Sequence, residues 1–279
     1  MRLPNTNFRM KPLRTAVIQN SATADMDANL ERLDSVLSLC EGADLVALPE
    51  VFALRGSSRR YRENAQPLDG PLVSNMRAAA RKFGAWLLAG TIIEKRGSRR
   101  YNTCVLIDRS GRIRAVYRKI HLFEARLDDT RIIRESDDYS PGREPVLASI
   151  EGWRVGLSVC YDLRFPELFR FYAANGAHAL LVPSNFTART GTDHWEILVR
   201  ARAIENQCFL VAPNQCGVNE ETGVASHGHS CVIGPWGEIL AMAGRKPCVI
   251  RAVLEPSRLH EIRDRIPALK HMRRSLFQG

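Results

Sequence analysis

The sequence lacks the features that would direct it into a membrane or a secretory pathway. No apolar run reaches the roughly 18 residues that a helix needs to span a bilayer, and the first 14 residues, MRLPNTNFRMKPLR, contain no apolar signal core. This segment also lacks acidic residues, so a transit peptide is the alternative to a flexible N-terminal extension over residues 1–14. We expect no membrane partner.

The cysteines offer neither a disulfide framework nor a metal site. The seven cysteines are odd in number and form no C-x-x-C pair, which favours a reducing, cytoplasmic setting over a secreted one. The closest histidine pair, His227 and His229 in SHGHS, has no third ligand nearby in the sequence. We therefore expect neither a metal nor another cofactor.

Aromatic residues are also scarce for a nucleic-acid-binding protein. They make up 7% of the chain, and no nucleic-acid-binding module is recognisable, so no specific nucleic acid partner is expected. Positive charge is nevertheless plentiful, with a net charge of +10 and arginine clusters in RGSSRRYR, EKRGSRR and IRDRIPALKHMRRS. Solvated loops would explain these clusters, and so would the attraction of a small substrate that carries a carboxylate.

The chain is rich in short apolar runs that alternate with helical patterns. Its 279 residues are 45% hydrophobic and 25% charged, which fits one domain with a large core. Apolar spacing and boundary residues predict helices over 27–40, 71–83, 166–174, 194–206 and 256–265. Apolar runs predict strands at 15–20, 44–50, 85–95, 101–108, 113–123, 153–162, 178–186, 208–216, 228–240 and 248–255.

The two halves of the chain repeat the same order of elements. Each has a strand, a helix and a second strand that ends in proline plus a polar residue, LPE in the first half and VPSN in the second. We therefore predict an α/β fold with two similar α–β halves that pack sheet against sheet, with the helices outside. This fold occupies a single domain over residues 15–279.

Three potentially reactive side chains lie at the ends of predicted strands, where the functional groups of α/β folds are commonly found. Glu50 follows DLVALP, Lys119 interrupts the apolar stretch VYRKIHLF, and Cys160 ends VGLSV. Each also has an ordinary explanation: a loop carboxylate, an edge-strand lysine that discourages aggregation, or a small core residue. Composition and spacing alone leave both interpretations open.

The motifs around these residues resemble the nitrilase superfamily of carbon–nitrogen hydrolases. LPE at 48–50, YRKIHLF at 117–123 and CYDLRFPE at 160–167 occur in that family's order and spacing, and ESDDYSPG at 135–142 and GHSCVIGPWGEIL at 228–240 continue the match. The resemblance covers the chain from about residue 15 onward. The segments TGTDHWE and RARAIENQ indicate the branch that contains omega-amidase and deaminated-glutathione amidase.

The resemblance implies an α-β-β-α sandwich of the nitrilase type and assigns four catalytic residues. Cys160 would be the nucleophile, Glu50 the general base, Lys119 the cationic partner and Glu135 a second carboxylate. One ammonium at ~4 Å is strong enough to lower a thiol pKa by about two units. The two carboxylates oppose it, so we expect the four groups to titrate together. The resemblance also implies a homodimer, or a larger homo-oligomer, paired through helices near the cysteine.

Further residues are predicted to contact the oxyanion or the substrate: Tyr61, Tyr161, Arg164, Phe186 and Thr187. The backbone N–H of Tyr161 would stabilise the oxyanion together with the lysine. Phe186 and Thr187 would shape the acyl pocket, and Tyr61 would reach it from a loop.

Two roles are open for Arg164, which would either hold a substrate carboxylate or pair with Asp162 and position the turn. Glu196 is expected to brace the site. The segment EARLDDTRIIR, residues 124–134, is expected to border the pocket and leaves the size of the substrate open.

The expected function is a cysteine-dependent amidase. It would cleave the C–N bond of a small amide that carries a carboxylate, pass through a thioester and release ammonia. An N-carbamoyl amide hydrolase and a true nitrilase are the alternatives within enzymes. A non-catalytic scaffold that retains the fold is the alternative from another class.

Overall fold

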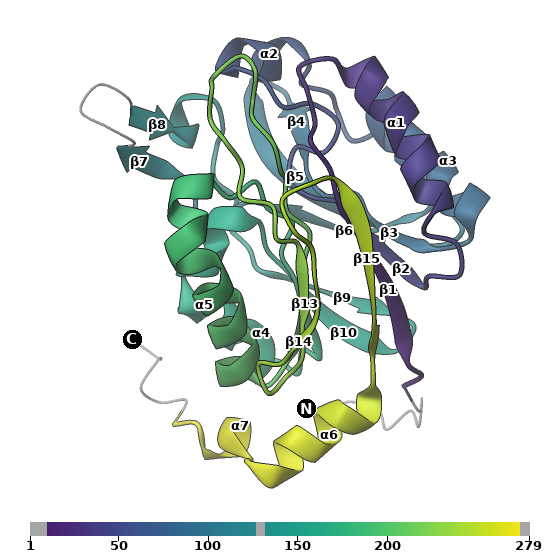
Figure 1. Cartoon of the computed structure of the whole chain (residues 1–279), viewed down its shortest axis with the longest axis vertical. Coiled ribbons are helices and arrows are strands. Elements are labelled where there is room, and N and C mark those ends of the chain that lie inside the picture. Colours follow the sequence, from purple (N-terminus) through teal and green to yellow (C-terminus); the bar gives the residue numbers. More distant parts are fainter. Residues whose placement is uncertain (1–9, 127–131, 274–279) are drawn as a thin grey trace.

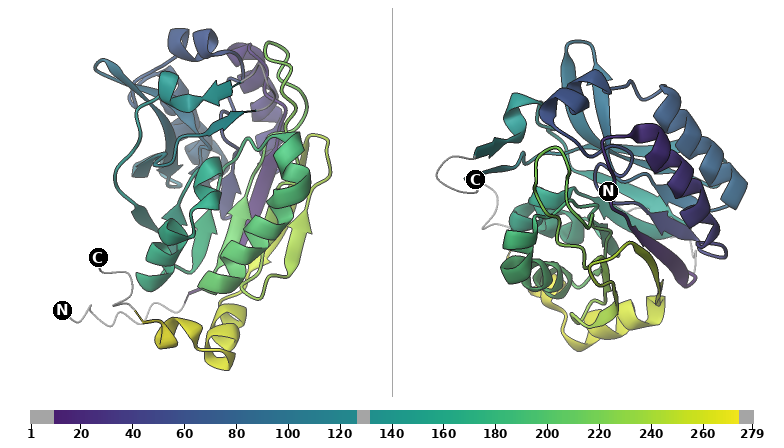
Figure 2. Two further views of the ribbon diagram at one scale, coloured as in Figure 1. Left: turned by 90° about the vertical axis from the view of Figure 1, so that its left-hand side faces the viewer. Right: turned by 45° about the horizontal axis from the view of Figure 1, so that its top comes forward.

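Two β-sheets pack face to face between outer layers of helices in the computed structural model, which describes residues 10–126 and 132–273 (Figure 1). The first sheet has the strand order β15-β1-β2-β3-β5-β4, with β6 beside β5, and the second has the order β14-β13-β12-β11-β10-β9. The right-hand view of Figure 2 shows α1 and α3 on one outer side and α4 and α5 on the other. The layers are those of the predicted α-β-β-α sandwich.

The elements have the following bounds. The first sheet contains β1 (Leu13–Gln19), β2 (Leu45–Ala47), β3 (Trp86–Leu88), β4 (Ile92–Arg96), β5 (Arg99–Ile107), β6 (Ile113–Arg118) and β15 (Cys248–Leu254). The second contains β9 (Val146–Ile150), β10 (Trp153–Leu157), β11 (Ala179–Leu181), β12 (Phe209–Ala212), β13 (Cys231–Ile233) and β14 (Ile239–Met242). A separate pair consists of β7 (Glu124–Arg126) and β8 (Ile132–Arg134). The helices are α1 (Met26–Ser38), α2 (Ser58–Glu63), α3 (Pro71–Phe83), α4 (Pro166–Ala174), α5 (Ala188–Asn206), α6 (Pro256–Arg265) and α7 (Ala268–His271), with the 3-10 turns η1 (Glu135–Asp137) and η2 (Cys160–Arg164).

The predicted similarity of the two halves is confirmed in the centre of each sheet. Strands β1, β2 and β3 are parallel neighbours in the first sheet, as are β10, β11 and β12 in the second. Parallel neighbours need long crossover connections, and these carry helices in both halves. Strands β2 and β11 therefore end at equivalent places, and LPE and VPSN follow them.

The apolar core lies mainly between the sheets. It joins residues of the first sheet, such as Val17 and Leu45, to Val155 and Leu180 of the second. A second cluster fills the space between the first sheet and the helices α1 and α3. Burial on both faces explains why the central strands are continuous apolar runs rather than alternating ones.

The helix predictions based on boundary residues are confirmed at 71–83, 166–174 and 256–265. Each of these helices begins with proline, whose missing N–H is not needed in a first turn. The helix α3 ends where Gly84 takes a left-handed φ of 60°. The helix α5 starts at Ala188, six residues before the predicted start at 194, and α1 stops at Ser38.

Several strands are shorter than predicted. The run 85–95 is divided into β3 and β4, which do not pair with each other. Strands β6 and β10 stop at Arg118 and Leu157, so Lys119 and Cys160 follow strands instead of lying in them. Strand β1 begins at Leu13 and thus includes two residues that we had assigned to the extension, while residues 1–9 lie outside the described part.

Within residues 10–126 and 132–273, no helix has the length and apolar character needed to cross a bilayer.

We predict that a single methyl group added at Gly90 has a large effect on the stability of the fold. A Cβ at Gly90 would lie 1.9 Å from the carbonyl oxygen of Pro49, whereas a Cβ at Gly97 would meet nothing within 4 Å. Both glycines have positive φ, so Gly97→Ala measures the backbone strain alone, about 1–2 kcal/mol. We expect Gly90→Ala to lower the free energy of unfolding in urea by several kcal/mol more, because the segment before Glu50 must move. Equal losses in the two variants would contradict this account.

Candidate active site

Four different turns bring the predicted catalytic residues together. Glu50 follows β2, Lys119 follows β6, Glu135 opens η1, and Cys160 opens η2. All four line one pocket of about 370 Å³. Glu50 and Cys160, which are 110 positions apart in the sequence (160 − 50), thus share one site. They meet because the two sheets face each other and each residue follows a central strand of its sheet.

Lys119 lies between two carboxylates. Its Nζ is 3.0 Å from Oε1 of Glu50, and 3.0 Å and 2.8 Å from Oε1 and Oε2 of Glu135. The lysine is 1% exposed and Glu50 is 3% exposed. A buried ammonium needs such partners, because an unpaired buried charge is strongly destabilising.

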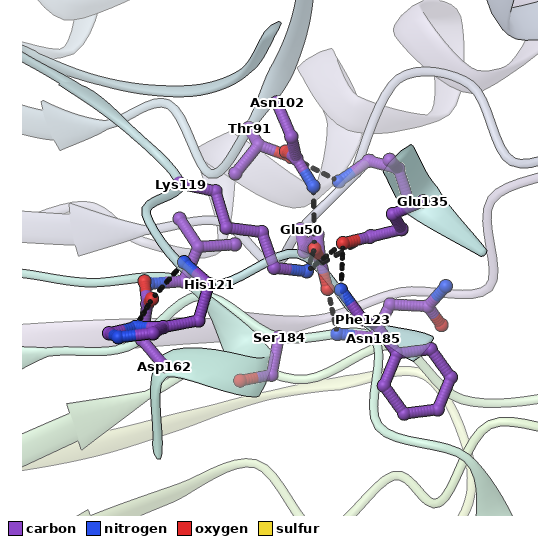
Figure 3. Close-up of polar contacts among 12 residues, drawn as sticks. Glu50, Thr91, Asn102, Lys119, His121, Phe123, Glu135, Asp162, Ser184 and Asn185 are labelled. Atoms are coloured by element: carbon purple, nitrogen blue, oxygen red, sulfur yellow. Dashed lines mark hydrogen bonds and ion pairs between the residues drawn. The ribbon is translucent and has the colours of Figure 1, made fainter. Parts of the chain in front are cut away.

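Neutral donors hold the two carboxylates in place (Figure 3). Asn102 Nδ2 donates to Oε1 of Glu50 at 2.8 Å, and the backbone N–H of Asn185 donates to Oε2 at 2.8 Å. The backbone N–H of Phe123 donates to Oε2 of Glu135 at 2.7 Å. Asn102, Phe123 and Asn185 were missed by sequence reasoning, although an asparagine within the apolar run YNTCVLI is a detectable signal.

The backbone of Lys119 is fixed on both sides. Its N–H donates to the carbonyl of Asn102 at 2.9 Å, and its carbonyl accepts from Gly142 at 2.8 Å. A Cβ at position 142 would lie 2.1 Å from the carbonyl oxygen of Arg118. The glycine of the YSPG motif is therefore required by the close approach of the chain to the lysine segment.

Cys160 occupies a strained turn. Its φ is 45°, a left-handed value that is uncommon outside glycine. Its N–H donates to the carbonyl of Pro183 at 3.0 Å, and Asp162 accepts from the backbone N–H of Val159 at 2.8 Å. Non-glycine residues with such values concentrate at active sites, where the surrounding structure enforces them.

Asp162 links this turn to the lysine segment. Its fully buried carboxylate accepts from the hydroxyl of Tyr117 at 2.7 Å and from the backbone N–H of His121 at 3.1 Å, and it contacts Nδ1 of His121 at 2.8 Å. These contacts give Asp162 a structural role in the turn. Its oxygens are occupied by these donors, so the suggested pairing with Arg164 is not what the structure shows.

The thiol of Cys160 is held in its protonated form. Burial raises its pKa well above the ordinary value, the nearby carboxylate of Glu50 raises it further, and Lys119 only partly offsets both. Burial by itself would lower the pKa of Lys119, but Glu135 and Glu50 outweigh it and the pKa is raised well above normal. The pKa of Glu135 is raised by burial and by Glu50, against the opposing effect of Lys119. The lysine therefore does not produce a resting thiolate, and a nucleophilic attack by this sulfur would require a base.

All of the predicted binding residues line the same pocket: Tyr61, Tyr161, Arg164, Phe186 and Thr187. The guanidinium of Arg164 lies over the ring of Phe186 at 5.1 Å, and its Nη1 is 3.3 Å from Nδ1 of His194. Among residues 10–126 and 132–273, no carboxylate lies within ion-pair distance of Arg164.

Tyr61 reaches the pocket from α2, and its ring lies 6.3 Å from that of Tyr139. Ion pairs on either side of Tyr61 fix this helix, from Arg60 to Glu221 at 2.9 Å and from Arg62 to Asp138 at 3.0 Å.

Two other expectations have different outcomes. Glu196 does not brace the site, because it projects from α5 and pairs with Arg200 at a half-exposed position. Residues 132–134 border the pocket as predicted, whereas residues 127–131 of the same segment lie outside the described part. No group of three or more metal-ligating side chains was found in the part of the chain that the structure describes.

Comparison with known proteins gives consistent relatives over nearly the whole chain. The carbon-nitrogen hydrolase family model matches residues 14–264. The chain is 39% identical over 269 residues to the deaminated glutathione amidase of Synechocystis sp.. The aligned region covers 94% of this chain and 98% of that protein. It is 34% identical over 270 residues to the omega-amidase of Homo sapiens, covering 96% and 98% respectively.

A solved structure supports the same relationship. A branch 10 member of the nitrilase superfamily from Saccharomyces cerevisiae superposes with a TM-score of 0.85 at 30% identity, covering 95% of this chain and 97% of that one. The predicted nitrilase-type fold is therefore confirmed.

The protonation state of Cys160 can be tested by alkylation. We expect the labelling of Cys160 by iodoacetamide, read by mass spectrometry, to rise with a midpoint at higher pH than that of an ordinary free thiol, because burial and Glu50 raise the pKa of Cys160 well above its usual value. Glu50→Gln removes a charge that raises this pKa, so its midpoint should move to lower pH. Asp138→Asn, in the same pocket but paired to Arg62, is the control and should change little. A midpoint below pH 8 in the unmodified chain would contradict the assignment.

Proposed function

The chain belongs to the carbon-nitrogen hydrolase family and is an amidase of the nitrilase superfamily, and we propose that Cys160 is its nucleophile for a small amide that carries a carboxylate. The observation that supports this most strongly is the buried contact of Lys119 with Glu50 and Glu135 in the pocket that Cys160 lines. Two buried ionisable groups, Lys119 and Glu50, and the half-buried Glu135 are costly to maintain beside one thiol. They include a carboxylate that can take the thiol proton and a cation that can stabilise an oxyanion, the two groups that acyl transfer by a cysteine uses.

The first step joins Sγ of Cys160 to the carbonyl carbon of the amide. Glu50 accepts the thiol proton as the bond forms, because the raised pKa keeps the thiol protonated at rest. The carbonyl π electrons move onto oxygen. Lys119 and the backbone N–H of Tyr161 stabilise the resulting oxyanion.

The second step breaks the C–N bond. The oxyanion re-forms the carbonyl, Glu50 returns its proton to the leaving nitrogen, and ammonia or an amine departs from a thioester. Glu50 then takes a proton from water, whose oxygen attacks the thioester carbon. Collapse of this second oxyanion breaks the C–S bond and releases a carboxylic acid, and Glu50 returns its proton to the sulfur to restore the thiol. Glu135 keeps the lysine in position throughout.

Arg164 supports the choice of an anionic substrate. Its guanidinium is partly exposed in the pocket, stacks on Phe186 and has no carboxylate partner among the described residues. Arginine binds carboxylates through two parallel hydrogen bonds. We assign the acyl-chain carboxylate to Arg164. The names of the relatives, deaminated glutathione amidase and omega-amidase, make deaminated glutathione and omega-amides that carry a carboxylate the first substrates to try.

The proposed setting is the cytoplasm, and the proposed assembly is a homodimer or a larger homo-oligomer. All seven cysteines are free, which suits a reducing compartment. Exposed apolar side chains on the helices after the cysteine, Phe171 at 44%, Ile197 at 69% and Ile204 at 49%, support pairing through α4 and α5. Light scattering should give at least twice the 31.3 kDa of one chain, and a stable monomer would contradict the proposed assembly.

Turnover by Cys160 can be tested with a panel of substrates. We expect release of ammonia or amine from omega-amides and an acyl adduct on Cys160 in the mass spectrum. Cys160→Ala should lower kcat at least about 10³-fold without altering the circular dichroism spectrum, because it removes the nucleophile. Cys248→Ala, a substitution on β15 outside the pocket, is the matched control.

The same panel separates the alternatives. Release of carbon dioxide together with ammonia from carbamoyl compounds would indicate a carbamoyl hydrolase, and consumption of nitriles would indicate a nitrilase. An active Cys160→Ala protein would exclude the proposed nucleophile. A folded chain that turns over none of these compounds would favour the non-catalytic scaffold.

A further inference from the structure

Arg55 is a second guanidinium of the pocket wall, and it is buried. The residue is 1% exposed and lies five positions after Glu50. Its Nη1 donates to the carbonyl of Cys216 and to the hydroxyl of Ser226, each at 2.8 Å, and its Nη2 donates to the hydroxyl of Ser21 at 3.3 Å. All three acceptors are neutral oxygens.

Arg55 forms no ion pair within the described part of the chain, and Glu220 acts on its charge only from beyond ion-pair distance. No carboxylate of residues 10–126 and 132–273 lies within ion-pair distance, and Nε has no hydrogen-bond partner there. Buried charges in proteins are normally paired, because the loss of hydration is costly. A buried arginine that keeps its charge without an ion pair is suited to interact with a bound ligand or with a nearby anionic group.

A short chain of hydrogen bonds connects Arg55 to the reaction centre. The hydroxyl of Ser226, which accepts from Arg55, donates to Oδ1 of Asn185 at 2.6 Å. The backbone N–H of Asn185 donates to Oε2 of Glu50 at 2.8 Å. The guanidinium therefore lies two hydrogen bonds from Asn185, beside the base and the nucleophile. Phe186, the next residue, carries the guanidinium of Arg164 over its ring.

The balance of charge in the pocket gives the buried guanidinium of Arg55 a function. The catalytic cluster contains two carboxylates, Glu50 and Glu135, and one ammonium, Lys119, so it repels an anionic ligand. Arg164 can offset one negative charge by direct contact with a substrate carboxylate. An anion that enters the pocket still meets the excess charge of the two glutamates, which another cation must balance. Arg134 also lines the pocket but is paired with Glu124 at 2.9 Å, whereas Arg55 is in no ion pair among the described residues.

We propose that Arg55 determines specificity for anionic amides, by supplying from inside the pocket wall the positive charge that balances the catalytic carboxylates when a substrate carboxylate binds. Arg55 acts through its field and not by contact, since its Nη atoms are used by Cys216, Ser226 and Ser21. Fields act strongly there because little water screens them. The inference rests on the proposed function in taking the substrate to be an amide.

The test measures binding, not turnover. In the Cys160→Ala background, calorimetry gives the Kd of glutaramate, an anionic amide, and of glutaramide, its neutral isostere. The ratio of the two values is the preference for the anion. We expect Arg55→Met to reduce this ratio about tenfold or more, by weakening glutaramate, whereas Arg55→Lys retains most of it because the charge remains. Arg164→Gln, which removes the direct contact, should also reduce it.

Arg59→Met is the matched control. It removes the same charge from an arginine of α2 whose side chain is 82% exposed, and solvent screening should leave the ratio unchanged. Equal weakening of both ligands by Arg55→Met would show a purely structural role and overturn the proposal, as would an unchanged ratio.

A second neutral variant, Arg55→Gln, answers the question if the methionine variant does not fold. If both neutral variants fail to fold while Arg55→Lys folds, the charge serves the fold and the proposal is wrong. An unmodified chain without amidase activity would contradict the proposed function and leave this binding result standing. An active chain with an unchanged ratio would contradict only the role of Arg55.

Discussion

The buried contact of one ammonium with two carboxylates is the interaction on which the rest of the site depends. Lys119 touches Glu50 and Glu135 at 2.8–3.0 Å in a place that excludes most water. Removing one member of a buried ion pair commonly lowers the free energy of unfolding by about 3–5 kcal/mol, because the remaining charge is neither paired nor hydrated. The surrounding fold therefore has to hold all three together, and amide and backbone donors occupy the remaining carboxylate oxygens.

This arrangement changes the expected role of the lysine. A single ammonium near a thiol would favour the thiolate, but burial and Glu50 act in the other direction and prevail at Cys160. In the proposed reaction Cys160 is therefore a thiol at rest, and its proton moves to Glu50 only as the sulfur attacks. The role proposed for Lys119 is then to stabilise the oxyanion, a charge that exists only during the reaction.

Positive charge in the pocket is divided between groups with different surroundings. Lys119 is paired, Arg164 is partly exposed and stacked on an aromatic ring, and Arg55 is buried among neutral oxygens. Of these three groups, only Lys119 is in an ion pair within the described part of the chain. A cavity with this distribution is prepared for an anion, since the ligand and not the protein completes the balance of charge.

The sequence by itself determined most of the helices, the places of the central strands, the order of the motifs and the candidate reactive residues. Proline and glycine at helix ends fixed 71–83, 166–174 and 256–265 because they act locally, and the ordered motifs revealed the family. Only the tertiary structure decided what depends on distant atoms. It shows that Asn102, Asn185 and Arg55 lie in the site, whereas Glu196 lies outside it. It also shows that Asp162 contacts Tyr117 and His121 and not Arg164. It also set the thiol pKa, because burial and charge–charge distances are properties of the folded chain that no local pattern encodes.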